Sequence, residues 1–240
     1  MAEHRVVICT VAWGGWYPRG VARMIQAFHE VSPGFEIQAW VNIKPPFTPT
    51  MTRGGRDYTG YAAKAQALRH AFNTGADVAL LLDASFYPIR SIHPLLDYIA
   101  QTGYYLCRNG NVVGEWSSDD CLKEMATDRD AAMKIPEASS YAVGISRHHA
   151  WAMELMRAWS VWSMNAVVIC GRHSAPHTNG HNAGFVSVDK RVLGHRHDQA
   201  CLSILAQQMG LTELVARPRF SSYAGSETEE TVLVNAGMSE

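Results

Sequence analysis

The densest group of side chains capable of chemistry lies at residues 194–199, Gly-His-Arg-His-Asp-Gln. Two imidazoles, a guanidinium, a carboxylate and an amide stand together just before a predicted helix, whose N-terminus favours an anion. Histidine and aspartate can bind a metal ion, and aspartate can also act as a general base. The alternative interpretation is a polar turn in which Asp198 only caps the helix.

Asp83 is a second candidate because it follows the most apolar segment of the chain, residues 78–82. Parallel α/β sheets bind ligands outside the carboxyl ends of their strands, which is where Asp83 would lie. A carboxylate there can hold Mg²⁺ or Mn²⁺, or accept hydrogen bonds from the ribose of a nucleotide. A single aspartate at a strand end can also have a purely structural role.

Residues 13–20 form a Gly-rich turn after the first predicted strand, and Lys64 lies on a predicted helix. Trp13, next to Gly14, could stack on a base or a sugar ring, or could belong to the core. Lys64 could contact phosphate, or be a solvated charge on the helix surface. These residues are candidates for a nucleotide site, each with a structural alternative.

Three histidines, His173, His177 and His181, repeat at intervals of four, which on a helix would align them as metal ligands. A proline and a glycine between them disfavour a helix, so the sequence predicts a loop over residues 171–184. We expect this loop to close over the substrate or to carry surface histidines.

Short apolar segments alternate with segments of helical periodicity along the chain. Predicted strands cover residues 5–12, 35–43, 76–82, 104–107, 141–146 and 231–235, and predicted helices cover 21–28, 61–73, 92–102, 118–125 (with Ser118 as N-cap), 148–164 and 199–209. A turn is expected at 109–111, and irregular segments at 44–60 and 217–230. The alternation predicts one α/β domain over residues 1–240, with a Rossmann-like, mostly parallel sheet flanked by helices.

Composition and charge narrow the class of protein. Of 240 residues, 47% are hydrophobic and 18% are charged, as in a globular domain. The net charge of −1 creates no overall field that would attract nucleic acid or a membrane. Five cysteines without a C-x-x-C pair predict reduced thiols. The sequence has neither a signal region nor an apolar segment of about 18 residues, which predicts a cytoplasmic protein without a membrane partner.

In order and spacing, several segments between about residues 5 and 215 resemble the GT-A-type glycosyltransferase-like proteins of bacterial, phage and environmental genomes, within the nucleotide-diphospho-sugar transferase superfamily. The most specific of these segments is 194–199. The others are residues 16–20, 61–64, 81–85, 114–119, 135–137 and 143–145. The resemblance implies a GT-A fold, a nucleotide-sugar donor and transfer of its sugar to a hydroxyl acceptor.

The resemblance places Asp83 and Ser85 at the D-x-D motif of GT-A enzymes. This motif implies Mn²⁺ or Mg²⁺, but serine replaces the second aspartate, which argues against tight metal binding. Asp198–Gln199 resembles the Asp-Gln pair that some retaining GT-A enzymes present near the anomeric carbon. Those enzymes often bind the metal with a histidine further along the chain, so here His195 or His197 would have to serve.

The residues and the resemblance together give each candidate a role. Asp198 and Gln199 are expected at the reacting carbon. Donor binding is assigned to Trp13, Gly14, Lys64, Asp83, Ser85 and Arg196, metal binding to Asp83, His195 and His197, and the acceptor side to Glu115, Asp119 and His181. In this scheme Lys64 and Arg196 neutralise the diphosphate, which is the charge that develops during transfer.

Two other functions stay open. A nucleotidyltransferase shares the strand-end aspartate, but it usually has a basic Gly-rich loop after the first strand, where this chain has only Arg19. A nucleotide- or sugar-binding module without catalysis would explain the missing second aspartate. For a transferase, the acceptor could be a glycan, a small molecule or a hydroxymethylated pyrimidine in DNA, although the net charge of −1 gives DNA no support.

Overall fold

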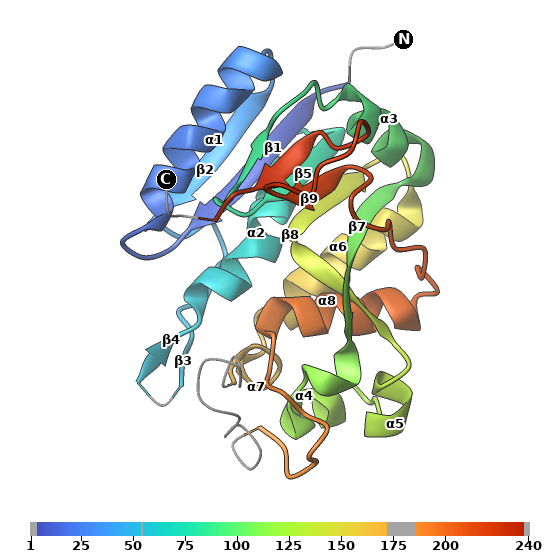
Figure 1. Ribbon diagram of the computed structural model, residues 1–240. Coiled ribbons are helices and arrows are strands. Elements are labelled where there is room, and N and C mark those ends of the chain that lie inside the picture. The colour runs from blue at the N-terminus through green and yellow to red at the C-terminus, as the bar shows by residue number, and fades with distance from the viewer. Residues whose placement is uncertain (1–3, 54, 172–185, 238–240) are drawn as a thin grey trace.

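The computed structural model describes residues 4–53, 55–171 and 186–237 (Figure 1). Its main sheet has the strand order β2-β1-β5-β8-β7, with β1 (Val6–Ala12), β2 (Glu36–Val41), β5 (Val78–Leu82), β7 (Tyr104–Val112) and β8 (Pro136–Ser146). β1 pairs in parallel with β2 and β5, whereas β8 is antiparallel to both of its neighbours. All strands of this sheet except β8 therefore point the same way, which confirms the expected mostly parallel sheet.

Helices cover both faces of this sheet (Figure 1). The helices α1 (Tyr17–Val31) and α3 (His93–Thr102) pack on one face, and α2 (Thr59–Asn73), α6 (Ala150–Trp162) and α8 (His197–Gln208) pack on the other. Side chains of β5 alternate between the two cores: Leu80 and Leu82 lie with α1 and α3, and Leu81 lies with α2. Because both faces are covered, β5 is apolar throughout, and Asp83 follows at its carboxyl end.

Shorter strands and helices surround this core. A second sheet has the order β6-β10-β9, with β6 (Phe86–Pro88), β9 (Ser221–Tyr223) and β10 (Leu233–Asn235), and a hairpin pairs β3 (Thr52–Arg53) with β4 (Arg56–Asp57). The short helices are η1 (Val113–Glu115), α4 (Asp119–Glu124), α5 (Arg129–Ala132) and α7 (Ala166–Ile169). Ser118 caps α4 as predicted, because its Oγ accepts a hydrogen bond from the Cys121 amide at 3.1 Å.

Two segments that the sequence predicted as irregular contain strands. The hairpin lies within 44–60 and β9 lies within 217–230. These strands have two or three residues each, which is too short for an alternating pattern to be visible. β7 also continues through the predicted turn at 109–111. β8 begins at Pro136, ahead of the predicted start at 141, because Ser139 and Ser140 interrupt the apolar pattern on which the prediction rests.

The cysteines and two of the tryptophans lie in or against the core. All five cysteines are buried and free, as predicted. Trp159 is 1% exposed in the core, and Trp162 packs against the same cluster. In the described ranges of the chain, no helix is both long enough and apolar enough to cross a membrane.

Candidate active site at the carboxyl ends of the strands

Lys64 stands at the centre of the candidate site. Its Nζ lies 2.8 Å from Asp83 Oδ1 and 3.3 Å from Asp198 Oδ2. The lysine comes from α2, Asp83 follows β5, and Asp198 lies in the first turn of α8. The side chains of Lys64 and Asp198 are only 12% and 3% exposed. Three segments that are distant in sequence therefore meet in a group of one cation and two carboxylates, in which Lys64 and Asp198 are largely buried and Asp83 is partly exposed.

The electrostatics of this group keep the lysine charged. Burial lowers the pKa of Lys64, but the charges of Asp198 and Asp83 outweigh burial and raise this pKa above its ordinary value. Burial also raises the pKa of Asp198, and the Lys64 charge offsets part of that rise. An ionised Asp198 is consequently a stronger base than an ordinary aspartate.

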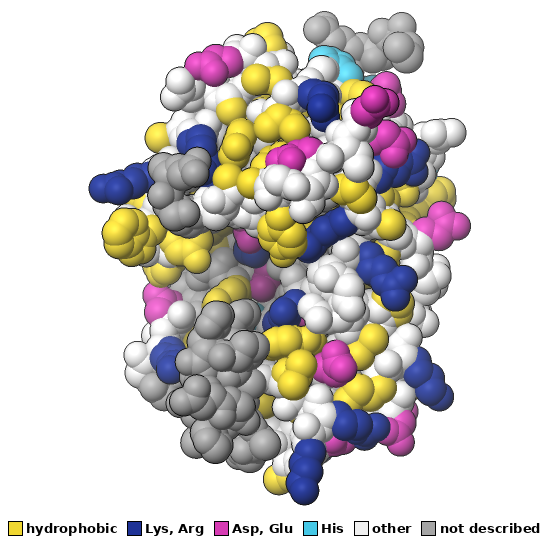
Figure 2. Space-filling model, in the orientation of Figure 1, with side chains coloured by type: hydrophobic (Ala, Val, Ile, Leu, Met, Phe, Trp, Pro, Cys, Tyr) yellow, Lys and Arg dark blue, Asp and Glu magenta, His cyan; other side chains and the backbone are white. Residues whose placement is uncertain are grey.

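Two cavities meet at Lys64. One has a volume of about 310 Å³ and is also lined by Asp83, Arg196, Asp198 and other polar residues. The other has a volume of about 200 Å³ and adds Trp13 to the lining. The space-filling view shows the molecule hollowed across this face, with acidic and basic side chains inside the hollow (Figure 2). The position agrees with the general rule that α/β sheets bind ligands at the carboxyl ends of their strands.

Arg196 is held by a carboxylate that the sequence interpretation did not assign. Its Nη1 lies 3.1 Å from Glu137 Oε2, and its guanidinium lies over the Trp116 ring at 3.9 Å. Glu137 is fully buried, and its Oε2 also accepts a hydrogen bond from Asn109 at 2.6 Å. Burial raises the pKa of Glu137, and Arg196 and Asn109 partly offset this rise. The only signal for Glu137 was its presence in the segment 135–137.

The N-terminus of α8 places the Asp-Gln pair. Asp198 lies in the first turn while Arg196 occupies the N-cap position, so the alternative of Asp198 as the cap is wrong. The carboxylate is directed to Lys64, and its backbone carbonyl accepts a hydrogen bond from Trp159 Nε1 at 3.2 Å. Gln199 Oε1 accepts a hydrogen bond from the Ser140 amide at 3.3 Å. Both side chains are therefore fixed from neighbouring elements and line the larger cavity.

No protein-family model and no curated protein sequence matches this chain. Solved structures of low sequence identity do match this chain. Mouse xyloside xylosyltransferase 1 matches 98% of this chain and 97% of its own, with a TM-score of 0.52 and 6% identity. The bifunctional glycosyltransferase WbbM matches 99% of this chain and 47% of its own, with a TM-score of 0.53 and 10% identity. This chain shares its fold with these two glycosyltransferases. The likeness confirms the fold class that the resemblance implied.

In this glycosyltransferase fold, the turn after β1 borders the smaller cavity. Trp13 Nε1 donates a hydrogen bond to Asp57 Oδ2 at 2.9 Å, and Asp57 Oδ1 accepts one from the Thr59 amide at 2.8 Å. The Gly14 amide donates to Asn42 Oδ1 at 2.9 Å. Gly14 has a φ of +111°, a conformation that side-chain-bearing residues rarely adopt. The indole of Trp13 is thereby held at the cavity wall.

The two histidines of the segment 194–199 lie in different surroundings. His195 is fully buried, its Nε2 donates a hydrogen bond to the Val168 carbonyl at 2.8 Å, and its Nδ1 accepts one from the Ser118 amide at 3.3 Å. His197 donates from Nδ1 to the Ile169 carbonyl at 2.8 Å, and its ring stacks on Tyr61 at 4.0 Å. His195 therefore ties α7 to the start of α4, whereas His197 lines the larger cavity.

The residues expected to hold Mn²⁺ or Mg²⁺ do not fit such an ion. The Lys64 ammonium lies between Asp83 and Asp198, in the position that a bridging cation would take. Ser85 directs its carbonyl to Arg23, and both ring nitrogens of His195 bind backbone groups. Across residues 4–53, 55–171 and 186–237, no group of three or more His, Cys, Asp or Glu side chains could hold a metal ion. We therefore derive no chemical step through a metal.

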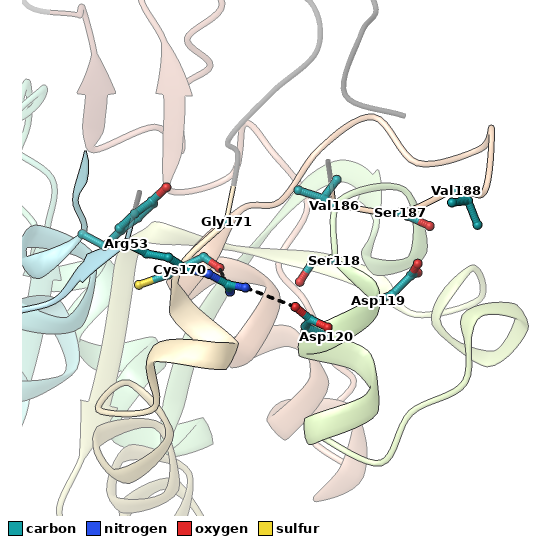
Figure 3. A pocket seen from close by; sticks show the side chains of 10 residues that line it. Arg53, Ser118, Asp119, Asp120, Cys170, Gly171, Val186, Ser187 and Val188 are labelled. Carbon is teal, nitrogen blue, oxygen red and sulfur yellow. Dashed lines mark hydrogen bonds and ion pairs between the residues drawn. The ribbon is translucent and has the colours of Figure 1, made fainter. Parts of the chain in front are cut away.

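The two acceptor-side candidates within the described residues, Asp119 and Glu115, do not line the cavities at Lys64. Asp119 lines a separate cavity of about 370 Å³, together with Ser118, Asp120 and Arg53 (Figure 3). Asp119 pairs with Arg129 at 2.6 Å, and Asp120 pairs with Arg53 at 3.4 Å across this cavity (Figure 3). The cavity is thus polar, and each of its two described carboxylates is paired with an arginine.

Of the other acceptor-side predictions, the structure describes only Glu115. Glu115 lies in η1 and borders none of the three cavities described above. Its carbonyl accepts a hydrogen bond from the Leu193 amide at 2.7 Å. His173, His177 and His181, with nearly all of the predicted closing loop at 171–184, lie outside the described residues.

Proposed function

We propose that this protein transfers a glycosyl group from a nucleotide-sugar donor to a hydroxyl acceptor. One observation carries the proposal: Lys64 is buried between Asp83 and Asp198 at the carboxyl ends of the strands, inside a fold shared with glycosyltransferases. Burying a carboxylate and an ammonium costs desolvation energy, which their mutual attraction repays only in part. Such perturbed groups in a cleft are typical of catalytic sites.

The donor would lie across the two cavities. Trp13, beside Gly14, offers an aromatic face for the base in the smaller cavity. Asp83 lies where the cavities meet and would accept hydrogen bonds from ribose hydroxyls or from the sugar, with Ser85 beside it. The larger cavity holds Arg196, Asp198 and the sugar-phosphate portion. This placement brings the anomeric carbon towards the Asp-Gln pair.

The reaction breaks the bond between the anomeric carbon and the diphosphate oxygen, and its electron pair leaves with the nucleoside diphosphate. The acceptor oxygen forms the new bond to that carbon, and its proton passes to the Asp198 carboxylate. Lys64 holds Asp198 in its ionised form until the proton arrives. Gln199, fixed by the Ser140 amide, orients the sugar.

A glycan or small-molecule hydroxyl is the acceptor that we favour. A hydroxymethylated pyrimidine in DNA is the alternative acceptor, but binding to the DNA backbone needs clustered cations, and the net charge here is −1. A binding module without turnover is the second candidate function. The serine at position 85, where the resemblance expects an aspartate, favours that candidate.

Donor breakdown tests the proposal without a known acceptor. Wild-type protein is incubated with UDP-sugars and GDP-sugars, and released nucleoside diphosphate is measured by ³¹P NMR. We expect slow hydrolysis of one donor class and none with Asp198→Asn. A donor that binds with no release under any condition would support the binding module. If no nucleotide sugar binds at millimolar concentration, the transferase proposal fails.

A further inference from the structure

The cations of the larger cavity differ in how much of their charge is already neutralised. Lys64 faces two carboxylates, Asp83 and Asp198. Arg196 faces the buried carboxylate of Glu137. Arg217, the other cation among the described lining residues, has no carboxylate within ion-pair distance in the described part of the chain. A dianionic ligand entering this cavity would therefore find its uncompensated positive charge at Arg217.

Arg217 is held rigidly by aromatic rings. Its guanidinium lies over the Tyr141 ring at 4.7 Å and over the Tyr223 ring at 4.5 Å. Its Nη2 donates to Ser139 Oγ at 3.3 Å, and its Nε is buried without a hydrogen-bond partner among the described residues. Rings on the faces of a guanidinium leave its N–H groups to bind in the plane, which is the geometry that phosphate oxygens match.

The main chain brings Arg217 to this place from beyond the last helix. The Val215 amide donates to the Leu106 carbonyl at 2.8 Å, and the Arg108 amide donates to the Val215 carbonyl at 2.9 Å. The segment before Arg217 thus adds to the edge of β7. On the other side, the Tyr141 carbonyl accepts from the Asp83 amide at 2.8 Å. Tyr141 therefore contacts both residues: its ring contacts Arg217, and its carbonyl contacts the strand-end Asp83.

We infer that Arg217, held between Tyr141 and Tyr223, binds the diphosphate of the donor and neutralises the leaving group. This role deepens the proposed function and rests on it. Transfer requires that the departing diphosphate be neutralised by a metal ion or by cationic side chains. Lys64 already occupies the place between the two carboxylates, so the protein's own arginine supplies this charge. Neutralisation of the leaving group then needs no divalent cation.

Binding of nucleoside diphosphates tests the role without catalysis. Isothermal titration with UDP, GDP and inorganic pyrophosphate is carried out in EDTA on the wild type, on Arg217→Gln and on Arg219→Gln. Arg219 is the matched control because it lies on the same segment, is exposed and borders neither cavity of the site. We expect Arg217→Gln to weaken UDP or GDP by about 10- to 100-fold and Arg219→Gln to leave affinity unchanged. Uridine or guanosine should bind both variants as they bind the wild type.

The outcomes separate the two proposals. If the wild type binds UDP or GDP and Arg217→Gln binds it equally well, the Arg217 role is wrong while the proposed function stands. The same conclusion follows if wild-type binding disappears in EDTA and returns with Mn²⁺. If neither nucleotide binds the wild type with or without Mn²⁺, both proposals fail. Should Arg217→Gln not fold, Arg217→Met, which keeps the apolar stem between the rings, replaces it under the same criteria.

Discussion

Lys64 is the one cation that pairs with both Asp83 and Asp198 among the described residues. The stability of the protein therefore depends on this lysine. The Asp198 side chain is 3% exposed and relies on the ammonium for compensation. Removing one member of a buried ion pair typically costs about 3–5 kcal/mol, because a charge is left buried without its partner. Lys64→Met should therefore lower the free energy of unfolding by about this amount near pH 8.

The pH dependence of that loss has a defined sign. Without Lys64, burial and the charge of Asp83 keep the folded pKa of Asp198 raised against the opposing hydrogen bond with Ser140. The variant is therefore most stable below the unfolded pKa of about 3.9 and loses stability as pH rises. The pKa of Lys64 is itself raised in the wild type, so its stabilisation is complete across pH 5–8. The difference between wild type and Lys64→Met should widen from pH 5 to pH 8 in urea unfolding.

A matched variant separates this effect from loss of a surface charge. Lys134 is exposed and has no ion-pair partner within the described ranges. Lys134→Met removes the same charge and adds the same side chain. Its unfolding free energy should stay within about 0.5 kcal/mol of the wild type at both pH values. If the free energy of unfolding of Lys64→Met were below that of the wild type by the same amount at pH 5 and pH 8, the proposed compensation of Asp198 by Lys64 would be wrong.

Asp198 permits a second prediction at the scale of one residue. Asp198→Asn removes the proposed base but keeps the shape of the side chain. Turnover should fall by about 10²–10⁴-fold, the usual contribution of a general base. Donor affinity should change little because the interaction is made chiefly in the transition state. Nucleoside diphosphate release and titration with the same donor measure the two quantities. Loss of donor binding together with turnover would instead make Asp198 a ground-state ligand of the donor.

The long elements could be predicted from sequence because each carries a local pattern of apolar residues, either continuous or periodic. β5 is apolar throughout since both faces are covered, and the amphipathic pattern of α1 marks the face that it buries. β9 and the β3–β4 hairpin could not be predicted, because two or three residues show no alternation and their pairing depends on distant strands. The predicted strand at 141–146 was shorter than β8, because Ser139 and Ser140, which line the cavity, interrupt its apolar pattern.

Contact between η1 and α5 yields a prediction about an element. A Cβ added at Gly114 would lie 2.6 Å from the Met133 amide nitrogen and 2.8 Å from its Cα. These are backbone atoms that cannot rotate away, so Gly114→Ala should destabilise the protein by about 1–3 kcal/mol, as overpacking does. η1 is followed by Trp116, whose ring supports Arg196 at 3.9 Å. Nucleoside diphosphate release should therefore fall as well.

Gly15→Ala is the control for that experiment. Gly15 has no atom within 4 Å of an added Cβ and lies in the exposed turn after β1. Chemical denaturation of both variants should show a shift for Gly114→Ala and almost none for Gly15→Ala. Equal stability of the two variants would mean that η1 and α5 can separate without cost.

At the scale of the molecule, the site is assembled from segments that no local pattern connects. Lys64 and Asp83 were predicted as donor residues for separate reasons, and only the fold brings Asp198 to the same ammonium. For Glu137 the sequence offered only its place in the segment 135–137, and Arg217 lay in a segment predicted as irregular. Residue types suggest chemistry, but charge compensation between them depends on tertiary contacts.

This dispersed assembly predicts a global response to the donor. A ligand that contacts Trp13, Asp83 and Arg217 at once binds only the folded chain, so its binding energy adds to the stability of the whole molecule. At a concentration about 100 times its Kd, a nucleotide sugar should stabilise the fold by about 2.7 kcal/mol. For a chain of 240 residues this corresponds to a rise in Tm of about 5–11 °C.

Thermal unfolding with UDP-sugars, GDP-sugars and free sugars measures this rise, with and without Mn²⁺. We expect one nucleotide-sugar class to raise Tm, free sugars to leave it unchanged, and EDTA to have no effect on the shift. Asp83→Asn should keep the wild-type fold, since Asp83 lies beyond the strand, while its Tm responds less to the same donor concentration. A full response in Asp83→Asn would remove Asp83 from the donor site. A rise in Tm that requires Mn²⁺ would show that Lys64 and Arg217 do not by themselves supply the charge that the diphosphate needs.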